Sequence, residues 1–260
     1  MTSVGEMIKA KLKSIRRAVS SDMRLIFHYP APHYDAAANE RYWEVRRATG
    51  MGELNEFQRE RADMILAATR GTGTLLDIGS GDGAMLSYIR SKSALTIMAS
   101  DISPMACQHL RQQGFSIVDV DLRSPDAIET LAEVDYISLC EVLEHLHDPE
   151  CVVVKLLGRA RKSVVFSVPN TGYYAHRLRL LFGRFPLQWR VHPGEHLRFW
   201  TLRDMRWWLE GLGLSAAAKV RPYQKVGLLG EVLPGLFARG IMVEIVSSES
   251  GNVVRQNDDR

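Results

Sequence analysis

The sequence predicts an α/β fold in which a doubly wound parallel sheet is covered by helices on both faces. From Thr74 onward, short apolar or β-branched runs alternate with helical stretches, which is typical of parallel strands joined by crossover helices. The first of these runs leads directly into a glycine-rich loop, as in open sheets that bind a ligand at the carboxyl ends of their strands. The 260 residues are 46% hydrophobic and 24% charged, which suffices for one sizeable core.

The elements follow in order along the chain. A helix is expected at residues 56–69, directly before the first strand. The candidate strands are residues 74–78, 95–100, 115–120, 134–139 and 163–168, followed by a late pair at 214–220 and 241–246. Further helices are expected to begin after Gly83, at Pro104, at Pro149 and at Leu202, because proline suits a first helical turn and Thr201 can cap the last helix.

Three segments lie outside this alternation. Residues 1–55 hold a basic stretch and then an aromatic one, and we expect a helical extension that acts as a lid on the main domain at 56–246. Residues 170–200 form an insertion much longer than the usual connection of about 4 to 6 residues, which favours a functional role on the acceptor side. Residues 247–260 are polar and are predicted to be a flexible tail.

Composition narrows the class of protein. The formal net charge of +3 does not by itself call for a nucleic acid or a membrane as partner. The three cysteines, Cys107, Cys140 and Cys151, lack C-x-x-C spacing, so neither a zinc knuckle nor a disulfide framework is indicated, and a reducing cytoplasm fits best. No run approaches the roughly 20 apolar residues of a membrane span. We expect a soluble cytoplasmic protein, with peripheral membrane contact by the basic N-terminal helix left open.

The loop after the first strand reads Asp77-Ile78-Gly79-Ser80-Gly81-Asp82-Gly83. Glycine lets the backbone turn sharply and approach a ligand without a Cβ in the way. Its spacing also fits a nicotinamide dinucleotide, but the Asp77 carboxylate attracts the ammonium of a methionine group and repels a diphosphate, and Asp82 adds a second negative charge. We expect S-adenosylmethionine to bind at Asp77, Gly79, Ser80, Gly81 and Asp82. A nicotinamide dinucleotide and a solvated turn without ligand are the alternatives.

Two more carboxylates stand at the ends of the next strands. Asp101 closes the second candidate strand, where an acidic side chain can accept hydrogen bonds from both ribose hydroxyls. Asp121 follows the third strand, where it can accept from the adenine amino group.

The run from Leu75 to Gly83, with Asp101 and Cys140-Glu141-Val142-Leu143-Glu144-His145-Leu146, resembles the class I S-adenosylmethionine-dependent methyltransferases over about residues 56–246. Val168-Pro169-Asn170-Thr171-Gly172 and His196-Leu197-Arg198-Phe199-Trp200-Thr201 are similar to the MetW-like, type 11 branch. The resemblance implies a Rossmann-like sheet of seven strands with the last one antiparallel. It also implies a cofactor pocket lined by Asp77, Gly79, Asp101, Ile102, Asp121, Leu122 and Cys140, to which we add Glu141.

The run after the fourth strand carries the candidate catalytic residues. If it begins a helical turn, Glu141 shares one face with Glu144 or His145. His145 is one candidate, as a general base that takes a hydroxyl proton. Alternatively, Glu141, Glu144, His145 and the later His196 hold Mg²⁺ or another divalent metal that makes the hydroxyl more acidic. The catalytic set is therefore His145, Glu141 and His196.

A second resemblance bears on the metal. The Glu-x-x-Glu-His run at 141–145, with His196 ahead of an aromatic residue and Thr201, is similar to the small-RNA 2′-O-methyltransferases, whose corresponding residues bind magnesium. The remaining interpretation is structural, with Glu144 and His145 bracing the loop.

Arginines dominate the segment from Tyr173 to Arg206, which runs into the helix expected at Leu202. They are Arg177, Arg179, Arg184, Arg190, Arg198, Arg203 and Arg206, against the acids Glu195 and Asp204. Because arginine suits bidentate recognition of phosphate or carboxylate, this segment favours an anionic acceptor such as a phosphorylated sugar, an acidic glycan or a nucleic acid. A solvated surface is the alternative.

These observations predict methyl transfer to a hydroxyl oxygen of an anionic small molecule or a cell-surface glycan. Oxygen is preferred because the Asn-Pro-Pro-Tyr signature of amide and base-amine methylation is absent after the fourth strand. The alternatives are metal-dependent 2′-O-methylation of RNA ribose and a MetW-like non-catalytic partner subunit of an acyltransferase.

Overall fold

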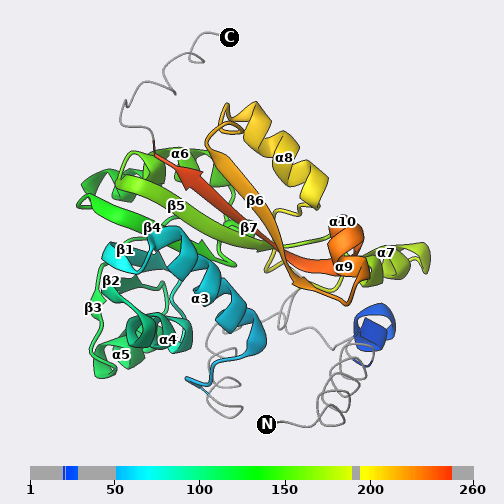
Figure 1. Cartoon of the computed structure of the whole chain (residues 1–260), viewed down its shortest axis with the longest axis horizontal. Coiled ribbons are helices and arrows are strands. Elements are labelled where there is room, and N and C mark those ends of the chain that lie inside the picture. Colours follow the sequence, from blue (N-terminus) through cyan, green and yellow to red (C-terminus); the bar gives the residue numbers. More distant parts are fainter. Residues whose placement is uncertain (1–19, 21, 29–50, 189–193, 248–260) are drawn as a thin grey trace.

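A seven-stranded sheet forms the centre of the molecule (Figure 1). The computed structural model describes residues 20, 22–28, 51–188 and 194–247. The strands are β1 (Thr72–Ile78), β2 (Ala94–Ser100), β3 (Ser116–Ile117), β4 (Val134–Cys140), β5 (Ala160–Pro169), β6 (Ala218–Lys225) and β7 (Ala238–Val246). They lie in the order β3-β2-β1-β4-β5-β7-β6.

Strand direction confirms the predicted topology. β1 to β5 pair in parallel, whereas β7 runs antiparallel to both of its neighbours, β5 and β6. The carboxyl ends of the parallel strands therefore meet along one edge of the sheet, and the loops that follow β1, β2 and β4 come together there.

The predicted span of the sixth strand, residues 214–220, is wrong. The preceding helix ends in a turn at Gly213, which has φ +71°. The amide of Leu214 donates a hydrogen bond to the carbonyl of Leu209, and the Leu214 side chain is buried. The strand begins only at Ala218 and continues through Pro222, which is tolerated because β6 is an edge strand. The third strand is also shorter than predicted, with only Ser116 and Ile117 paired to β2.

Five helices, those that start at Glu56, Ala84, Pro104, Pro149 and Leu202, begin where the sequence predicted, and the structure adds others. The helices are α3 (Glu56–Thr69), α4 (Ala84–Lys92), α5 (Pro104–Gln112), α6 (Pro149–Leu157), α7 (Tyr174–Leu181), α8 (Leu202–Gly211), α9 (Leu229–Val232) and α10 (Pro234–Phe237), with 3-10 turns η1 (Pro125–Thr130) and η2 (Leu143–His145). The side chains of Ser103, Asp148 and Thr201 accept hydrogen bonds from the first-turn amides of α5, α6 and α8.

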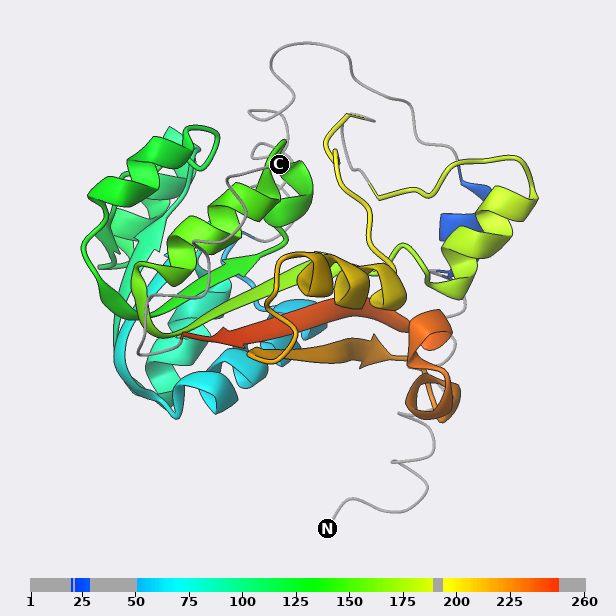
Figure 2. The same cartoon turned by 90° about the horizontal axis from the view of Figure 1, so that it is seen from above.

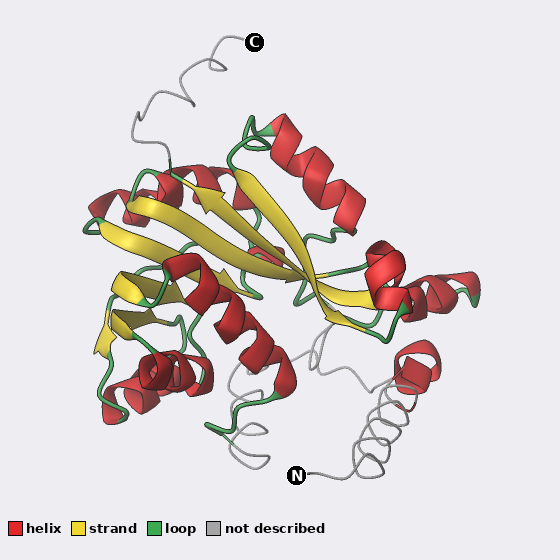
Figure 3. Ribbon diagram, in the orientation of Figure 1, coloured by secondary structure: helices red, strands yellow, loops and turns green. Residues whose placement is uncertain are grey.

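Helices cover both faces of the sheet, as Figure 3 shows. One buried cluster packs α3, α4 and α5 against β1 and β2 through residues such as Ile65, Leu86 and Leu110. The other packs α6 and α8 against β4, β5 and β7 through residues such as Val153, Met205 and Phe166. Because both faces of the sheet are packed against helices, the carboxyl edge of the sheet can position the side chains of the loops that follow the strands.

The insertion at 170–200 contains helix α7, and residues 22–28 lie beside it at one end of the molecule (Figure 2). The rest of the predicted lid, residues 1–19 and 29–50, and the predicted tail beyond residue 247 lie outside the described residues. No helix in the described part of the chain is long and apolar enough to cross a membrane.

Candidate active site

The glycine loop turns sharply between β1 and α4. Gly79 has φ +78°, and a Cβ built on it would lie 2.4 Å from Cγ2 of Val142. Its amide and that of Ser80 donate to the carbonyl of Ser100 at the end of β2. Gly83 has φ +73° and lies against Leu110 of α5. A side chain at Gly79 is therefore excluded both by backbone conformation and by contact with the loop after β4.

Asp77 is buried at the end of β1, with 1% of its surface exposed. One carboxylate oxygen accepts a hydrogen bond from the Ser138 hydroxyl of β4, while the other has no hydrogen-bond partner. Burial raises the pKa of Asp77 to about 6, although the Ser138 hydrogen bond and the nearby Arg61 oppose the shift. A buried carboxylate with one unsatisfied oxygen is well suited to receive a cationic group.

Asp101 lies at the end of β2 beside the loop. Its carboxylate accepts from the amides of Gly81 and Ser103, each at 2.9 Å, which holds the acid against the glycine turn. Burial raises its pKa above the ordinary value for an aspartate. The next residue, Ile102, exposes 52% of its surface, an unusual position for a branched apolar side chain at a sheet edge.

The other predicted cofactor residues occupy different positions. Asp82 is buried and accepts from the amides of Ala84 and Gly52, so it caps α4 and ties the segment before α3 to the loop. Asp121 is bound to Arg123, with Oδ2 2.6 Å from a guanidinium nitrogen. Leu122 is buried in the core. Burial raises the pKa of the Cys140 thiol to about 12, which makes it unreactive at neutral pH.

Glu144, His145 and His196 come together at the carboxyl edge. Each contributes a candidate ligand atom, and these atoms lie within 4.8 Å of one another. The two imidazole rings are edge to face with centroids 4.7 Å apart. Glu144 is 1% exposed, and neither of its carboxylate oxygens has a hydrogen-bond partner. The backbone carbonyl of Glu144 accepts from the amides of Leu197 and Arg198, which fixes the two loops to each other.

The ring nitrogens of the two histidines have different surroundings. Nδ1 of His145 lies 2.5 Å from the carbonyl oxygen of Glu195, which can only accept, so Nδ1 is the donor and Nε2 is the nitrogen not engaged by Glu195. Nδ1 of His196 is buried without a partner. Burial, followed by the neighbouring His145, lowers the pKa of His196 to about 4, so this ring is neutral at pH 7.

The structure does not bring Glu141 into this group. Glu141 precedes the 3-10 turn and has φ +59°, a left-handed conformation that is uncommon for a non-glycine residue. Its Oε1 accepts from the hydroxyls of Ser167 and Tyr223 and lies 3.4 Å from a guanidinium nitrogen of Arg61. The expectation that Glu141 shares a helical face with Glu144 or His145 is wrong, because no helical turn includes residue 141.

Arg61 is a site residue that sequence reasoning missed. It projects from α3, and its side chain is only 12% exposed. It lies close enough to Asp77 and Cys140 to lower the pKa of each group, and a guanidinium nitrogen lies 3.4 Å from the Glu141 carboxylate. Its Nε is buried without a hydrogen-bond partner. The available signal was an arginine on the helix that leads into the glycine loop, but nothing in the spacing indicated which helical face it occupies.

The arginines of the insertion divide into two kinds. Arg179 is 2% exposed and donates to the backbone carbonyls of Leu25, Ile26, His28 and Phe185. Arg198 binds the Glu150 carboxylate and the carbonyl of His147. Both are engaged in contacts within the fold, Arg179 fully buried and Arg198 with 39% of its side chain exposed. Arg177, Arg184, Arg203 and Arg206 are exposed, and Arg190 lies outside the described residues.

The sheet with its antiparallel β7, the glycine turn after β1 and the acids that follow β1 and β2 define a class I S-adenosylmethionine-dependent methyltransferase. The chain belongs to the methyltransferase domain family, whose model matches residues 53–219. No curated protein matches the sequence.

Solved structures share this fold at low sequence identity. Magnesium protoporphyrin IX methyltransferase from Synechocystis, solved with bound S-adenosylhomocysteine, superposes with a TM-score of 0.56 at 16% identity, covering 82% of this chain and 96% of that one. An O-methyltransferase family protein from Burkholderia thailandensis gives 0.56 at 13% identity, covering 90% and 70%. The methyltransferase domain of a bacterial Hen1 gives 0.54 at 18% identity, covering 74% and 100%. These likenesses establish the fold.

Proposed function

We propose that this protein transfers the methyl group of S-adenosylmethionine to a hydroxyl oxygen of an anionic acceptor, beside a divalent cation held by Glu144, His145 and His196. One observation carries the proposal: the buried Glu144 carboxylate has no hydrogen-bond partner on either oxygen and faces two imidazoles. Burial, followed by the negative charge of Glu141, raises the pKa of Glu144 well above its ordinary value, because a charged carboxylate in such a place is costly unless a cation compensates it.

The donor site follows from the residues around the loop. Asp77 receives the ammonium of the methionine moiety on its unsatisfied oxygen, and Asp101 accepts from the ribose hydroxyls. Ile102 offers an exposed apolar surface for one face of the adenine. Asp121 binds the adenine amino group while keeping its pair with Arg123. The backbone can approach the cofactor closely at Gly79, Ser80 and Gly81. The cofactor pocket is shaped by Asp82, Leu122 and Cys140.

The side chains fit a divalent cation in charge and protonation. One carboxylate and two imidazoles are a common ligand set for such ions, and the lowered pKa of His196 keeps that ring neutral. The His145 ring is oriented by the Glu195 carbonyl in the way that ligating histidines usually are, through the nitrogen that does not bind the metal. A bound divalent cation lowers the pKa of a coordinated hydroxyl, which makes the acceptor oxygen a better nucleophile.

The transfer itself requires alignment and removal of one proton. A lone pair of the acceptor oxygen forms the bond to the methyl carbon while the carbon–sulfur bond breaks, and the electron pair stays on sulfur to give S-adenosylhomocysteine. The hydroxyl proton leaves to solvent or to a base. Nε2 of His145 is free to take it in a cation-independent version of the reaction, because Nδ1 is committed to Glu195.

An anionic acceptor is supported by the charge of the neighbouring segment. Residues 171–194 contain no aspartate or glutamate, and Arg177 and Arg184 are exposed there. Arginine guanidinium groups bind phosphate and carboxylate with paired hydrogen bonds.

Metal content tests the proposal without an identified acceptor. Wild-type protein dialysed against Mg²⁺, Mn²⁺ or Zn²⁺ is expected to retain one ion per chain, and Glu144→Gln is expected to weaken retention at least tenfold. Glu141→Gln is the matched control, since Glu141 lies outside the group and should leave retention unchanged. Both variants should still bind S-adenosylhomocysteine, measured by calorimetry.

The outcomes separate the two chemistries. If wild-type protein retains none of the three ions, the cation is excluded. The enzyme is then supplied with S-adenosylmethionine and a panel of phosphorylated sugars as acceptors. If formation of S-adenosylhomocysteine persists in chelator but is lost in His145→Ala, His145 is the base. If neither donor nor product binds at all, the proposed methyl transfer is wrong.

A further inference from the structure

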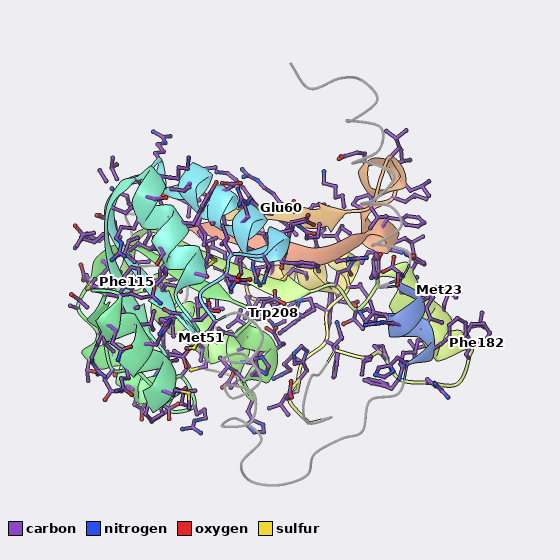
Figure 4. All side chains as sticks on the ribbon, turned by 90° about the horizontal axis from the view of Figure 1, so that it is seen from below. Met23, Met51, Glu60, Phe115, Phe182 and Trp208 are labelled. Carbon is purple, nitrogen blue, oxygen red and sulfur yellow. The ribbon has the colours of Figure 1, made fainter. Side chains whose placement is uncertain are left out.

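One end of the molecule carries an unusual number of exposed apolar side chains. They come from residues 22–28, helix α7 and the chain that leaves it, and are Met23, Phe27, Leu180, Leu181, Phe182 and Phe185, each 49% to 76% exposed. The rings of Phe27 and Phe182 lie 5.7 Å apart, so the two segments form one surface. Met23 and Phe182 mark it in Figure 4. We call these six residues the apolar end face.

This face is held in place by buried polar contacts. The guanidinium of Arg179 donates to three carbonyls at the end of the 22–28 segment, and Arg184 donates to the Phe27 carbonyl. Asp22, which is 2% exposed, accepts from the Tyr173 and Tyr174 hydroxyls and pairs with Arg239 of β7 at 2.7 Å. The side chains of the apolar end face are thus displayed by a rigid support.

The exposed charges on these two segments have one sign, because the only carboxylate there, Asp22, is buried. Arg24, Arg177 and Arg184 are exposed on the same two segments, and residues 171–194 contain no acidic residue. The sequence before this segment adds Lys9, Lys11, Lys13, Arg16 and Arg17 against the single acid Glu6. Apolar side chains bordered by arginine and free of carboxylates match the interface of an anionic bilayer.

Other occupants match less well. A second copy of the chain would place two arginine-bordered faces against each other in a symmetric dimer, which like charges oppose. A nucleic acid would use the arginines and stack on the aromatic rings, but Met23, Leu180 and Leu181 would remain exposed to water. A lipid surface accommodates all three kinds of side chain at once.

The apolar end face is linked to the candidate active site by a series of ring contacts. Phe185 lies edge to face with Phe199 at 5.3 Å, and the Phe199 ring is 6.5 Å from His196, which contacts His145. Leu197 and Phe199, exposed by 40% and 38%, lie along the same path. A molecule anchored in the bilayer would therefore meet the site from this end.

We propose that the apolar end face docks the protein on an anionic lipid surface, with the apolar side chains entering the interface and Arg24, Arg177 and Arg184 contacting lipid phosphates. Docking goes beyond methyl transfer and does not depend on it. Combined with the proposed function, it identifies the acceptor class as a hydroxyl on a lipid-linked molecule.

Vesicle flotation tests the docking. Full-length protein is expected to float with vesicles of phosphatidylcholine and phosphatidylglycerol in a 7:3 ratio, and to bind pure phosphatidylcholine about tenfold or more weakly because the anionic attraction is lost. The double variant Leu181→Ser/Phe182→Ser should lower binding to the anionic vesicles by about tenfold or more, since two apolar side chains no longer enter the interface. The matched control is Trp207→Ser, which removes a 73% exposed ring from α8 elsewhere on the surface and should bind as wild type does.

Calorimetry with S-adenosylhomocysteine on the same variants shows that each is folded, and it reports separately on the methyltransferase site. Absence of wild-type flotation, or equal flotation of the double variant, overturns the proposal. A dimer in light scattering that the double variant converts to a monomer, without vesicle binding, identifies a second copy as the occupant instead. Binding of single-stranded RNA that the double variant loses, again without flotation, identifies a nucleic acid.

Discussion

The carboxylate of Asp77 accepts a hydrogen bond from the Ser138 hydroxyl across the junction of β1 and β4, and its second oxygen is buried without any partner. The side chain is thus oriented by one neighbour and left unsatisfied on the side that is available to a ligand. In the ligand-free protein this arrangement is unfavourable, because burial disfavours the ionised form. A cationic head group removes the penalty, so binding and stability are linked at this residue.

The first prediction concerns pH. The folded pKa of Asp77, about 6, lies above its reference value of 3.8, so its favourable contribution is complete below pH 3.8 and is lost as the pH rises through about 6. Above pH 6, the ligand-free protein has therefore lost roughly 3 kcal/mol of its free energy of unfolding through this group. Asp77→Asn should remove this pH-dependent loss, because asparagine does not ionise, so the stability of the variant relative to wild type should rise between pH 4 and 7.

Urea unfolding of both proteins across this range measures the gain. The same variant should bind S-adenosylhomocysteine about 100-fold more weakly at pH 8, because the ammonium loses its charged partner. Asp121→Asn, which removes an exposed ion pair with Arg123, is the control and should change stability by less than about 1 kcal/mol. A variant less stable than wild type at pH 8 would show that Asp77 is not a penalised charge.

The second prediction concerns the turn at Gly79. Gly79→Ala should destabilise the protein by about 3 kcal/mol, because a left-handed alanine costs about 1 kcal/mol and the contact with Val142 adds more. Gly213→Ala is a matched comparison, since Gly213 has a similar φ of +71° but no atom within 4 Å of a built Cβ. Gly213→Ala should lower the free energy of unfolding by only about 1 kcal/mol. Equal losses in thermal unfolding would mean that the loop after β4 moves aside.

The third prediction separates Glu141 from Glu144. Glu141→Gln should destabilise the fold by about 1 to 3 kcal/mol, because the nearly buried Arg61 loses its ion-pair partner. Glu144→Gln in metal-free protein should be neutral or stabilising, since it removes a buried carboxyl group that has no hydrogen-bond partner. Denaturant unfolding after chelation measures both. The reverse order of stabilities would contradict the assigned partners.

The fourth prediction concerns the support of the apolar end face. Arg179→Met should destabilise the protein by about 2 to 4 kcal/mol and release residues 22–28, because several backbone carbonyls lose their donor. Hydrogen exchange read by mass spectrometry should show faster exchange in 22–28 while β1 and β4 keep wild-type protection. Arg203→Met, on an exposed position of α8, should change neither. Unaltered exchange in 22–28 would mean that Asp22 alone holds the segment.

Local signals in the sequence determined much of this protein. The glycine turn and the starts of α5, α6 and α8 follow from hydrogen bonds and dihedral preferences within a few residues, so Ser103, Asp148 and Thr201 could be interpreted in isolation. The parallel direction of the first strands followed from the alternation of strand and helix runs along the chain. The sequence also predicted the class of ligand, because a carboxylate beside the loop favours an ammonium over a diphosphate, and the match to the methyltransferase family agrees with that prediction.

Tertiary structure alone decided which distant side chains meet. The turn after α8 delayed β6, since burial of Leu214 against the helix outweighed the strand tendency of residues 214–217. A left-handed backbone at Glu141 turned its carboxylate to Arg61 and Tyr223, and away from Glu144. The burial of Arg179 beneath residues 22–28 depends on contacts more than 150 positions apart in the chain. Sequence spacing carries no information about such contacts, because they form only when two packed layers bring separate loops to the same edge.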